Sequence, residues 1–597
     1  MSKFYNKYIK DYDSIVSSAL QIIFGINSLL ALIIVVLITG FYLNSAQTAL
    51  LQHLMDITII IFVAQEAIRF VLDLGKSKEH RESRLMERIL AILLLAHLFS
   101  RETIVGAVES MFPQISIVDI TFIYLGLTQL LIIASYILDF VRRTKFSNIK
   151  IHPGTITAFS FGTAIIIGSL LLMLPKSVPL HSHISYIDAL FTSTSAVCVT
   201  GLSTINIADG FTLTGKIIIL LLIQIGGIGV MTISSFLTAI LLGGLSFRMN
   251  VMLREMLSED NMSEISSVLR RISFFTFGTE AVGAICLYYA LNGNFLTFNV
   301  DYFASAIFHS VSAFCNAGLS IYHGNLFSPI IHQNYAFYAT LMGLVLIGGI
   351  GFLAFSNLFS YILHKKDKMN RTIRRLNLTT KLIFVVSGII ILGGGLLIFL
   401  SESYAADASF STLERLFHSF FMVISSKTAG FDSVHLESMT NLTLLIIILV
   451  MWIGGSPGST GGGIKNTTLG VLFLHFFAYL RNSKQIRYSY RNIHPASVEK
   501  AQMVLFATLG VTILSTMLLV MFEPKYSLMQ LMFEAASAIS TTGLTLGLTP
   551  LLSSASKLVL VMTMFIGRIG TLTFMFIFAR SQDATNYEYP NEKVIVG

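Results

Sequence analysis

The chain has 597 residues, of which 54% are apolar and 12% are charged, and its mean hydropathy is +0.75. A charged fraction about half the soluble average of roughly 25% excludes an ordinary soluble enzyme and a disordered protein, and three cysteines exclude a disulfide scaffold. The net charge of +8 is compatible with an anionic partner. However, no long basic run or nucleic-acid motif is present, so the composition predicts a protein of the lipid bilayer.

Four apolar runs precede residue 150, and a helix that crosses a bilayer needs about 20 such residues. The runs cover residues 19–43, 54–74, 84–100 and 116–140. The first run is too long for a signal peptide, so we interpret it as a retained span. The third contains or borders Glu87, Arg88 and His97, so a helix lying in the membrane interface is an alternative there. Glu66 and Arg69 lie one helical turn apart and favour a packing pair over a voltage sensor.

Beyond residue 150, long apolar runs alternate with segments too short to cross a membrane. The predicted spans are 155–175, 213–243, 272–291, 335–362, 379–400, 443–480, 499–521 and 555–580. The half-length segments are 186–198, 300–315, 411–425 and 527–540. This order predicts an N-terminal membrane-helix block of unknown role, followed by four repeats of span, half-helix, loop and span. The predicted boundaries are 1–150 for the block and 151–250, 251–370, 371–490 and 491–597 for the repeats.

Lys and Arg cluster at alternate connections of these repeats, near 142–150, 248–271, 365–375 and 481–500. The opposite connections carry few, namely Lys176, Lys216, Lys525 and Lys557. Because positive loops remain in the cytoplasm, the half-helices are expected to enter from outside and the N-terminus to be cytoplasmic.

Each half-helix is followed by a glycine, and successive glycines are 117, 112 and 113 residues apart. A phenylalanine precedes each glycine by ten positions, and Ser185, Ser411 and Ser527 begin capping-box patterns. A half-helix that begins outside directs the negative end of its dipole toward the membrane centre, which favours a cation. The repeated glycines are Gly201, Gly318, Gly430 and Gly543.

Irregular backbone at membrane depth is tolerated where it lines a water-filled cavity or is buried in protein. Rings of backbone carbonyls can replace the hydration shell of a cation, and glycine lets successive carbonyls turn toward one axis. The repeat therefore predicts a pseudo-fourfold cation pathway in one chain; four loops that only pack together are the alternative. The candidate filter residues are Val199, Thr200, Gly201, Asn316, Ala317, Gly318, Thr428, Ala429, Gly430, Thr541, Thr542 and Gly543.

Residues 454–465 interrupt the long run 443–480, because Gly costs about 1 kcal/mol and Pro about 3 kcal/mol inside a helix. The segment is not a phosphate-binding loop, and its position predicts a gate below the filter; a structural kink is the alternative. Arg568 is predicted near the bilayer centre, where a charge usually marks an ion path, although a purely structural bond is also possible. The candidate gate residues are Gly454, Gly455, Gly458, Ser459, Thr460, Gly461, Gly462, Gly463, Lys465 and Arg568.

From about residue 151 onward the chain resembles the Trk/Ktr/HKT superfamily of potassium transporters, most closely the bacterial Trk/Ktr membrane subunits. The resemblance rests on the VTGL, NAGLS, KTAGF and TTGL loops, on GGSPGSTGGGIK and on GRIG. It implies an all-α integral membrane fold with four M1–pore helix–M2 repeats, preceded by about four extra helices. It also implies K⁺ uptake through a filter that binds K⁺, with Gly201 typical of a K⁺ filter because some Na⁺-preferring plant relatives have Ser there.

The same resemblance implies a homodimer in the plasma membrane, the bacterial inner membrane, and a separate cytosolic ring that binds nucleotides and controls opening. Na⁺ is a candidate coupling or regulatory ion, and no organic cofactor is expected in this chain. Two residues depart from the family pattern: Lys427 stands where many bacterial members have arginine, and Cys315 stands where a polar residue is expected.

Two other classes of function are weighed against ion uptake. A secondary transporter for a small organic solute predicts inverted repeats, whereas every half-helix here starts on one side. A membrane enzyme predicts clustered ligands or acid–base groups, whereas His309, His418 and His494 are scattered, so we expect no enzyme activity.

Overall fold

The computed structural model describes residues 13–73, 153–180, 182–229, 265–292, 299–327, 331, 334–364, 376–403, 411–483 and 485–578. These residues are predominantly helical, which confirms the predicted all-α membrane fold. The described strands, β1 (Arg487–Tyr488) and β2 (Arg491–Asn492), pair as one short antiparallel hairpin. The predicted runs 84–100 and 116–140 lie outside the described residues.

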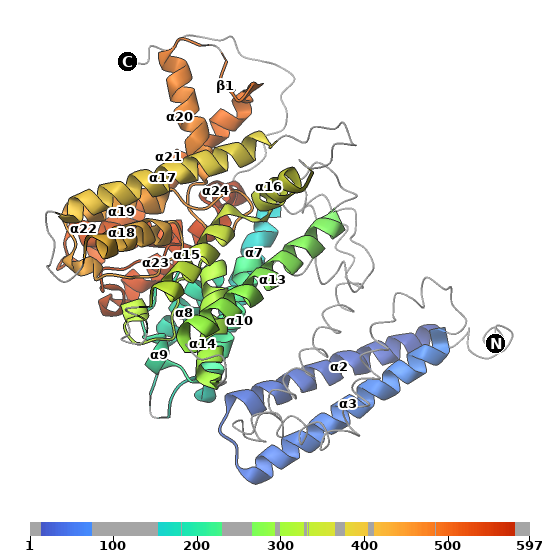
Figure 1. The fold of residues 1–597 in the computed structure, drawn as a ribbon. Coiled ribbons are helices and arrows are strands. Elements are labelled where there is room, and N and C mark those ends of the chain that lie inside the picture. Colours follow the sequence, from blue (N-terminus) through green and yellow to red (C-terminus); the bar gives the residue numbers. More distant parts are fainter. Residues whose placement is uncertain are drawn as a thin grey trace.

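Helices α2 (Asp13–Gly40) and α3 (Ser45–Asp73) form a hairpin beside the main bundle, shown in blue in Figure 1. An apolar cluster that includes Ile34, Ile38, Met55 and Phe62 holds the two helices together. The predicted packing pair of Glu66 and Arg69 forms a buried ion pair at 2.9 Å.

Four repeats of the same three parts make up the rest of the bundle (Figure 1). The first helices are α7 (Pro153–Leu172), α13 (Ile265–Asn292), α17 (Leu378–Ser403) and α21 (Pro495–Phe522). The half-helices are α8 (Tyr186–Cys198), α14 (Val300–Phe314), α18 (Thr412–Ser426) and α22 (Leu528–Ser540). The last helices are α10 (Leu213–Ile228), α15 (Tyr335–Ile350) with α16 (Phe352–His364), α19 (Asn441–Trp452) with α20 (Asn466–Leu480), and α23 (Ser554–Ile569) with α24 (Thr571–Phe578).

Short helical turns lie in the connections between these helices. They are η2 (Pro175–Ser177), α9 (Ile207–Gly210), η4 (Asn325–Phe327), η5 (Leu436–Ser438) and η6 (Thr549–Leu551).

The half-helices begin where their capping residues predict. Ser411 and Ser527 form complete capping boxes with Glu414 and Gln530. Ser185 accepts a hydrogen bond from the backbone N–H of residue 188, and the side chain of Asn299 caps α14 by accepting two backbone N–H groups. These caps satisfy N–H groups that a helix leaves unpaired at its start, so each half-helix has a fixed origin. We call the end of the bundle where the half-helices begin the entry end.

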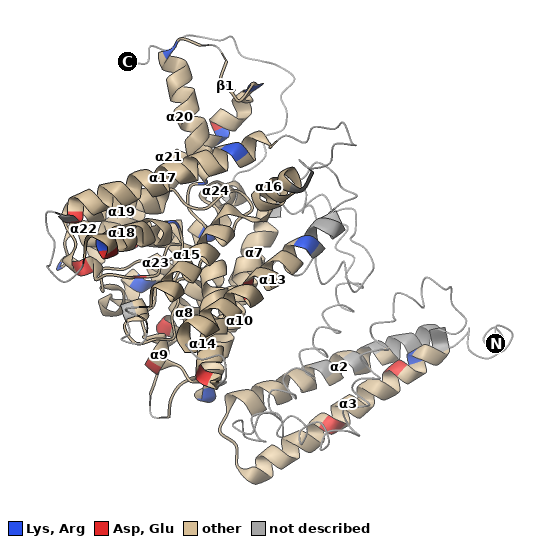
Figure 2. Ribbon diagram, viewed as in Figure 1, with Lys and Arg blue, Asp and Glu red and all other residues tan. Residues whose placement is uncertain are grey.

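Within the described residues, four helices are long and apolar enough to cross a membrane, or six if two bent pairs are each counted as one span. Large apolar side chains such as Phe159, Phe274 and Phe506 are exposed on the outer helices, as expected where lipid replaces water. Figure 2 shows few charged residues along the helices, with acidic residues near the ends of α9, α14 and α22.

The last helices of the second and fourth repeats are bent, which the sequence prediction missed, whereas the break in the third repeat was predicted. The predicted spans 335–362 and 555–580 are not straight, because α15–α16 and α23–α24 bend by 96° and 98°. The bends occur at Gly351 (φ +82°) and Gly570 (φ +97°), and α10 likewise ends at Gly229 (φ +88°). These left-handed conformations suit glycine and cannot continue a helix. Part of the predicted span 213–243 lies outside the described residues.

Candidate functional site: a ring of four glycine loops

The four loops that carry the predicted filter residues meet in a closed ring. We call them the glycine loops: residues 199–201, 316–318, 428–430 and 541–543. A Cβ placed on Gly201 would lie 2.6 Å from the carbonyl oxygen of Ala317 and 3.3 Å from Gly318 Cα. Gly318 stands in the same relation to the third loop, with Gly430 Cα 2.9 Å from its Cβ position.

The last two contacts close the circle. A Cβ on Gly430 would lie 3.0 Å from Gly543 Cα, and a Cβ on Gly543 would lie 2.7 Å from Gly201 Cα. Each glycine also faces the carbonyl of the residue before the next glycine, so no position has room for a side chain. Four residues separated by more than one hundred positions in the chain therefore surround one centre.

The backbone of each glycine loop adopts the left-handed conformation twice. The glycines have φ of +100°, +65°, +74° and +96°, in chain order. Two positions earlier, the φ values of Val199, Asn316, Thr428 and Thr541 are +56°, +60°, +74° and +50°. Three of these four are β-branched residues, for which positive φ costs of order 1–3 kcal/mol. Such strain persists only where surrounding contacts hold the loop in place, as at functional sites.

Serine side chains in the half-helices provide part of that support. Ser195 and Ser537 each accept the backbone N–H of the loop glycine at 3.0 Å. Ser312 donates to the carbonyl of Leu319 at 2.8 Å, and Ser425 donates to the carbonyl of Phe431 at 2.6 Å. These serines were missed in the sequence analysis, although three of them lie six positions before the glycine in the aligned repeats.

The loop carbonyls remain available for a ligand. Loop N–H groups point back to the half-helices, as when Thr200 and Thr542 donate to the carbonyls of Ser195 and Ser537. No donor among the residues that the structure describes bonds to the carbonyl oxygens of the glycine loops. The half-helix C-termini add partial negative charge near the same centre. The arrangement can replace the hydration shell of a cation.

The predicted gate residues form a compact loop between α19 and α20, which we call the α19–α20 loop (residues 453–465). Its two sides pair through the N–H of Gly454 to the carbonyl of Ile464 (2.9 Å) and the N–H of Gly455 to the carbonyl of Gly462 (3.3 Å). Gly458 (φ +72°) and Gly463 (φ +68°) make its reversals possible. The loop therefore has internal order, although its sequence excludes a helix.

The α19–α20 loop touches three of the four glycine loops or their helices. The N–H of Gly462 donates to Thr541 Oγ1 at 3.2 Å, and Gly461 packs against Thr428 with no room for a Cβ. Thr460 Oγ1 donates to the carbonyl of Phe314, the last residue of α14, at 3.3 Å. The predicted position beside the glycine loops thus agrees with the geometry.

Arg568 connects this loop to the first repeat. Its guanidinium donates to the carbonyls of Thr460 and Gly226, which lie in the α19–α20 loop and near the end of α10. Lys465 holds the other side of the loop by donating to the carbonyl of Gly461 at 2.6 Å. A single buried guanidinium with several fixed donors can hold two backbone segments together, which a lysine cannot do as well.

A second set of glycines packs the last helices against the half-helices. Gly226, Gly348 and Gly567 each face the carbonyl four positions before a loop glycine, at distances that exclude a Cβ. In the third repeat Gly454 instead faces the carbonyl of Gly462, so the α19–α20 loop takes over this contact. The signal was present in the sequence as the repeated pattern IGGIG, IGGIG, IGGSP and IGRIG. In this alignment Arg568 occupies a position that is glycine in the other three repeats.

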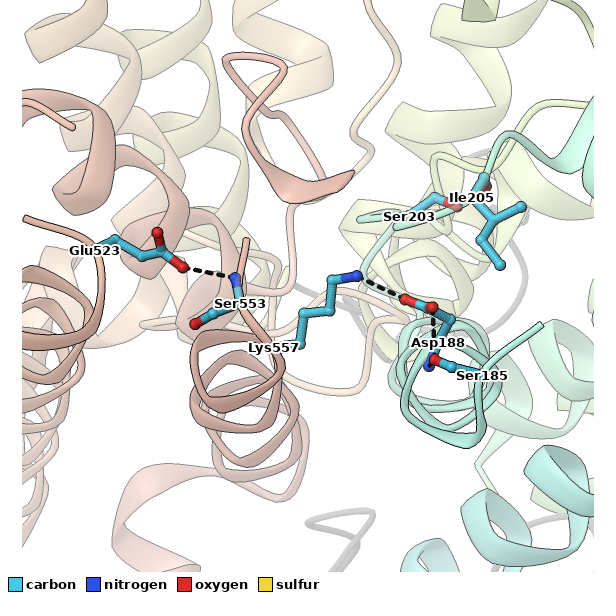
Figure 3. Close-up of polar contacts among 7 residues, drawn as sticks. All are labelled: Ser185, Asp188, Ser203, Ile205, Glu523, Ser553 and Lys557. Carbon is cyan, nitrogen blue, oxygen red and sulfur yellow. Dashed lines mark hydrogen bonds and ion pairs between the residues drawn. The ribbon is translucent and has the colours of Figure 1, made fainter. Parts of the chain in front are cut away.

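The seam between the first and last repeats is closed by an ion pair at the entry end. Lys557 Nζ lies 2.7 Å from Asp188 Oδ1, and both side chains are mostly buried (Figure 3). Burial alone would raise the pKa of Asp188, but hydrogen bonds from Lys557 and Ser185 bring that pKa below its usual value. Figure 3 also shows Glu523 accepting the N–H of Ser553 at 2.6 Å, which fixes the start of α23.

The two departures from the family pattern both lie behind the glycine loops. Lys427 Nζ donates to Ser387 Oγ of α17 at 3.2 Å. It borders a cavity of about 200 Å³ between α15 and α17, lined also by Gly349, Phe384 and Gly455. Cys315 is buried, and its thiol lies 3.7 Å from Glu280 Oε1.

Comparison with known proteins assigns the family. The sequence model of the TrkH family, described as cation transport protein, matches residues 124–588. The chain belongs to the TrkH family of cation transport proteins. The family match begins within the predicted N-terminal block, so most of residues 1–150 lie outside it.

Curated relatives of this TrkH-family chain include the potassium/sodium uptake protein NtpJ of Enterococcus hirae. It is 34% identical over 454 residues, which are 75% of this chain and 98% of that protein. The Ktr system potassium uptake protein D of Bacillus subtilis is 32% identical over 460 residues, or 76% and 100% of the two chains. The crystal structure of the potassium transporter TrkH from Vibrio parahaemolyticus shares the fold, with a TM-score of 0.59 at 20% identity, covering 82% and 98% of the chains.

Proposed function

We propose that this chain takes up K⁺ across the plasma membrane through the ring of glycine loops. The observation that carries the proposal is the closed circle of Gly201, Gly318, Gly430 and Gly543 with unpaired loop carbonyls. A ring of carbonyls at membrane depth suits a cation that has shed its water. The names of the uptake proteins from Enterococcus and Bacillus support K⁺ as that cation, and the name of the Enterococcus protein also includes sodium, which makes Na⁺ the candidate second ion.

In this proposal the α19–α20 loop is the gate and Arg568 is its latch. The loop contacts Thr428 and Thr541, which are themselves filter residues, so displacement of the loop would change access to the ring. Arg568 holds the loop to α10 through the carbonyls of Thr460 and Gly226. Opening would require these hydrogen bonds to break or to exchange partners.

The topology and the partners follow from the same proposal. The entry end faces outward, and α2 ends at this side because Lys176 of η2 donates to the carbonyl of Ile38. The N-terminus then lies in the cytoplasm, in agreement with the positive loops. The name Ktr system, carried by the Bacillus relative, supports a membrane subunit that works with a separate regulator. We propose a homodimer and a cytosolic nucleotide-binding ring as the assembly.

The test is uptake of ⁸⁶Rb⁺ or K⁺ into proteoliposomes that contain the purified chain, with Na⁺ or choline as the competing cation. We expect ⁸⁶Rb⁺ uptake that excess K⁺ blocks and that excess choline does not block. Uptake of an organic solute without any K⁺ flux would contradict the proposal and favour a conventional secondary transporter. That class predicts inverted repeats, whereas all four half-helices here begin at the entry end.

A further inference from the structure

One carboxylate lies in the middle of a membrane-spanning helix, away from the entry end. Glu280 is the only charged residue of the predicted span 272–291, and its side chain is 6% exposed. It follows residue 271 by nine positions and precedes residue 292 by twelve, or about 14 and 18 Å along α13. An ionisable group at this depth is costly to keep charged, and it usually has a function.

The carboxylate faces a carboxamide rather than a cation. Gln224 Nε2 of α10 lies 3.1 Å from both oxygens of Glu280. The thiol of Cys315, which ends α14, lies 3.7 Å from Oε1. No Lys, Arg or His within the described ranges makes an ion pair with Glu280.

Among the residues that the structure describes, the groups packed around Glu280 carry no charge that balances it. From α14, Ser310 donates to the backbone carbonyl of residue 280 at 2.7 Å, and Cys315 contributes a neutral thiol. From α15, the nearest side chain at the neighbouring Gly283 is the apolar Leu344. The guanidinium of Arg568 of α23 donates to the carbonyls of Thr460 and Gly226 and makes no ion pair with Glu280.

An orphan acceptor beside the carboxylate points to the missing ligand. Gln224 Oε1 is buried and accepts no hydrogen bond in the described part of the chain. A carboxylic acid and a carboxamide can form two complementary bonds, acid O–H to amide oxygen and amide N–H to acid carbonyl. A proton on Glu280, with rotation of the Gln224 amide, would satisfy this acceptor and remove the buried charge together.

We propose that Glu280 and Gln224 form a proton-binding site inside the membrane. A proton from water forms an O–H bond with the Glu280 carboxylate, and that O–H donates to Gln224 Oε1. Cys315, whose thiol lies 3.7 Å from Glu280 Oε1, directly precedes Asn316 of the second glycine loop, so loss of the proton places a negative charge behind the ion path. The proton-binding site itself does not depend on the proposed K⁺ uptake. The effect of the bound proton on uptake rests on that proposed function.

The test combines a spectroscopic titration with transport. Infrared difference spectra across a pH series report the C=O stretch of protonated carboxyl groups in the purified chain. One such band should disappear as pH rises, be absent in Glu280→Gln, and persist in the control Glu499→Gln, an exposed carboxylate of α21. Gln224→Leu removes hydrogen bonds from both forms of Glu280. Those to the ionised form are charge-assisted and about twice as strong, so the midpoint should shift to higher pH. This variant tests the site even if Glu280→Gln fails to fold.

In proteoliposomes, ⁸⁶Rb⁺ uptake by the natural sequence should rise with pH by about tenfold, as for one unit charge near an ion path. Glu280→Gln should hold uptake at the low-pH level across the series. An unchanged infrared band in Glu280→Gln, or a band that responds to Na⁺ instead of pH, would overturn the proton site. Absence of any uptake by the natural sequence would overturn the proposed function, and the infrared result would still decide the site.

Discussion

Replacement of Gly201 by serine tests whether the ring tolerates a side chain at its first glycine. A Cβ at this position would lie 2.6 Å from the carbonyl oxygen of Ala317 and 3.2 Å from Gly543 Cα, so the first loop must move away from two neighbours. The φ of +100° adds a backbone penalty of about 1–3 kcal/mol for any residue other than glycine. Relaxation of the loop then widens the ring at one of its four sides.

The expected loss of ion discrimination follows from the lower part of the range given for the backbone penalty. If about 1.4 kcal/mol of the penalty is relieved by distorting the carbonyl geometry, discrimination between K⁺ and Na⁺ falls about tenfold. The assay is ⁸⁶Rb⁺ uptake into proteoliposomes in competition with K⁺ and with Na⁺. Gly510→Ser is the matched control, because a Cβ on Gly510 of α21 meets nothing within 4 Å. A Gly201→Ser protein that folds and keeps the natural K⁺/Na⁺ ratio would refute the filter assignment.

Three further predictions concern the latch, the loop and the seam. Arg568→Gln should raise uptake at least tenfold without a regulator, because it loses two charged hydrogen bonds and about 1.5 kcal/mol from one of them already corresponds to about tenfold. Arg491→Gln in exposed β2 should leave uptake unchanged, and equal uptake by both variants would exclude the latch. Gly462→Ala should displace the α19–α20 loop, because its Cβ would clash with Thr541 Oγ1 and lie 3.0 Å from Thr541 Cγ2. Adding Thr541→Ala, which removes both atoms, should restore part of the natural flux; no recovery would count against direct contact. Lys557→Met should destabilise the purified protein by about 1–3 kcal/mol in thermal unfolding. Because the folded-state pKa of Asp188 is lowered, this difference should be present above the ordinary carboxyl pKa of about 4 and shrink as pH falls below it; a difference independent of pH would contradict the pairing.

The repeated parts of the site were accessible from the sequence because each recurs four times. The capping residues fixed the starts of the half-helices, and the spacing of the glycines identified the loops that meet in the ring. Single sequence runs are ambiguous, whereas four in the same order restrict the fold strongly. The closure of the ring from Gly543 back to Gly201 is a tertiary contact that spacing alone does not determine.

The features that sequence reasoning missed depend on contacts between repeats. The bends at Gly351 and Gly570 lie inside continuous apolar runs, so hydropathy treats each run as one straight span. Glu534 also escaped notice, because its partners are local and polar. Its buried carboxylate accepts Thr545 Oγ1, Thr549 Oγ1 and the N–H of Leu546, which supports the chain beyond the fourth loop. A search for lone charges within predicted spans would have found Glu280.

Because all four quarters belong to one polypeptide, they are free to diverge, as the third and fourth have done. An assembly of four identical subunits would repeat any insertion or any guanidinium four times around the centre, where four like charges would repel one another. Here Arg568 of the fourth repeat stands where the other three repeats have glycine, and the α19–α20 loop interrupts the last helix of the third repeat. A single chain thus permits an asymmetric loop and a single guanidinium beside an otherwise fourfold ring, with each component open to change by one mutation.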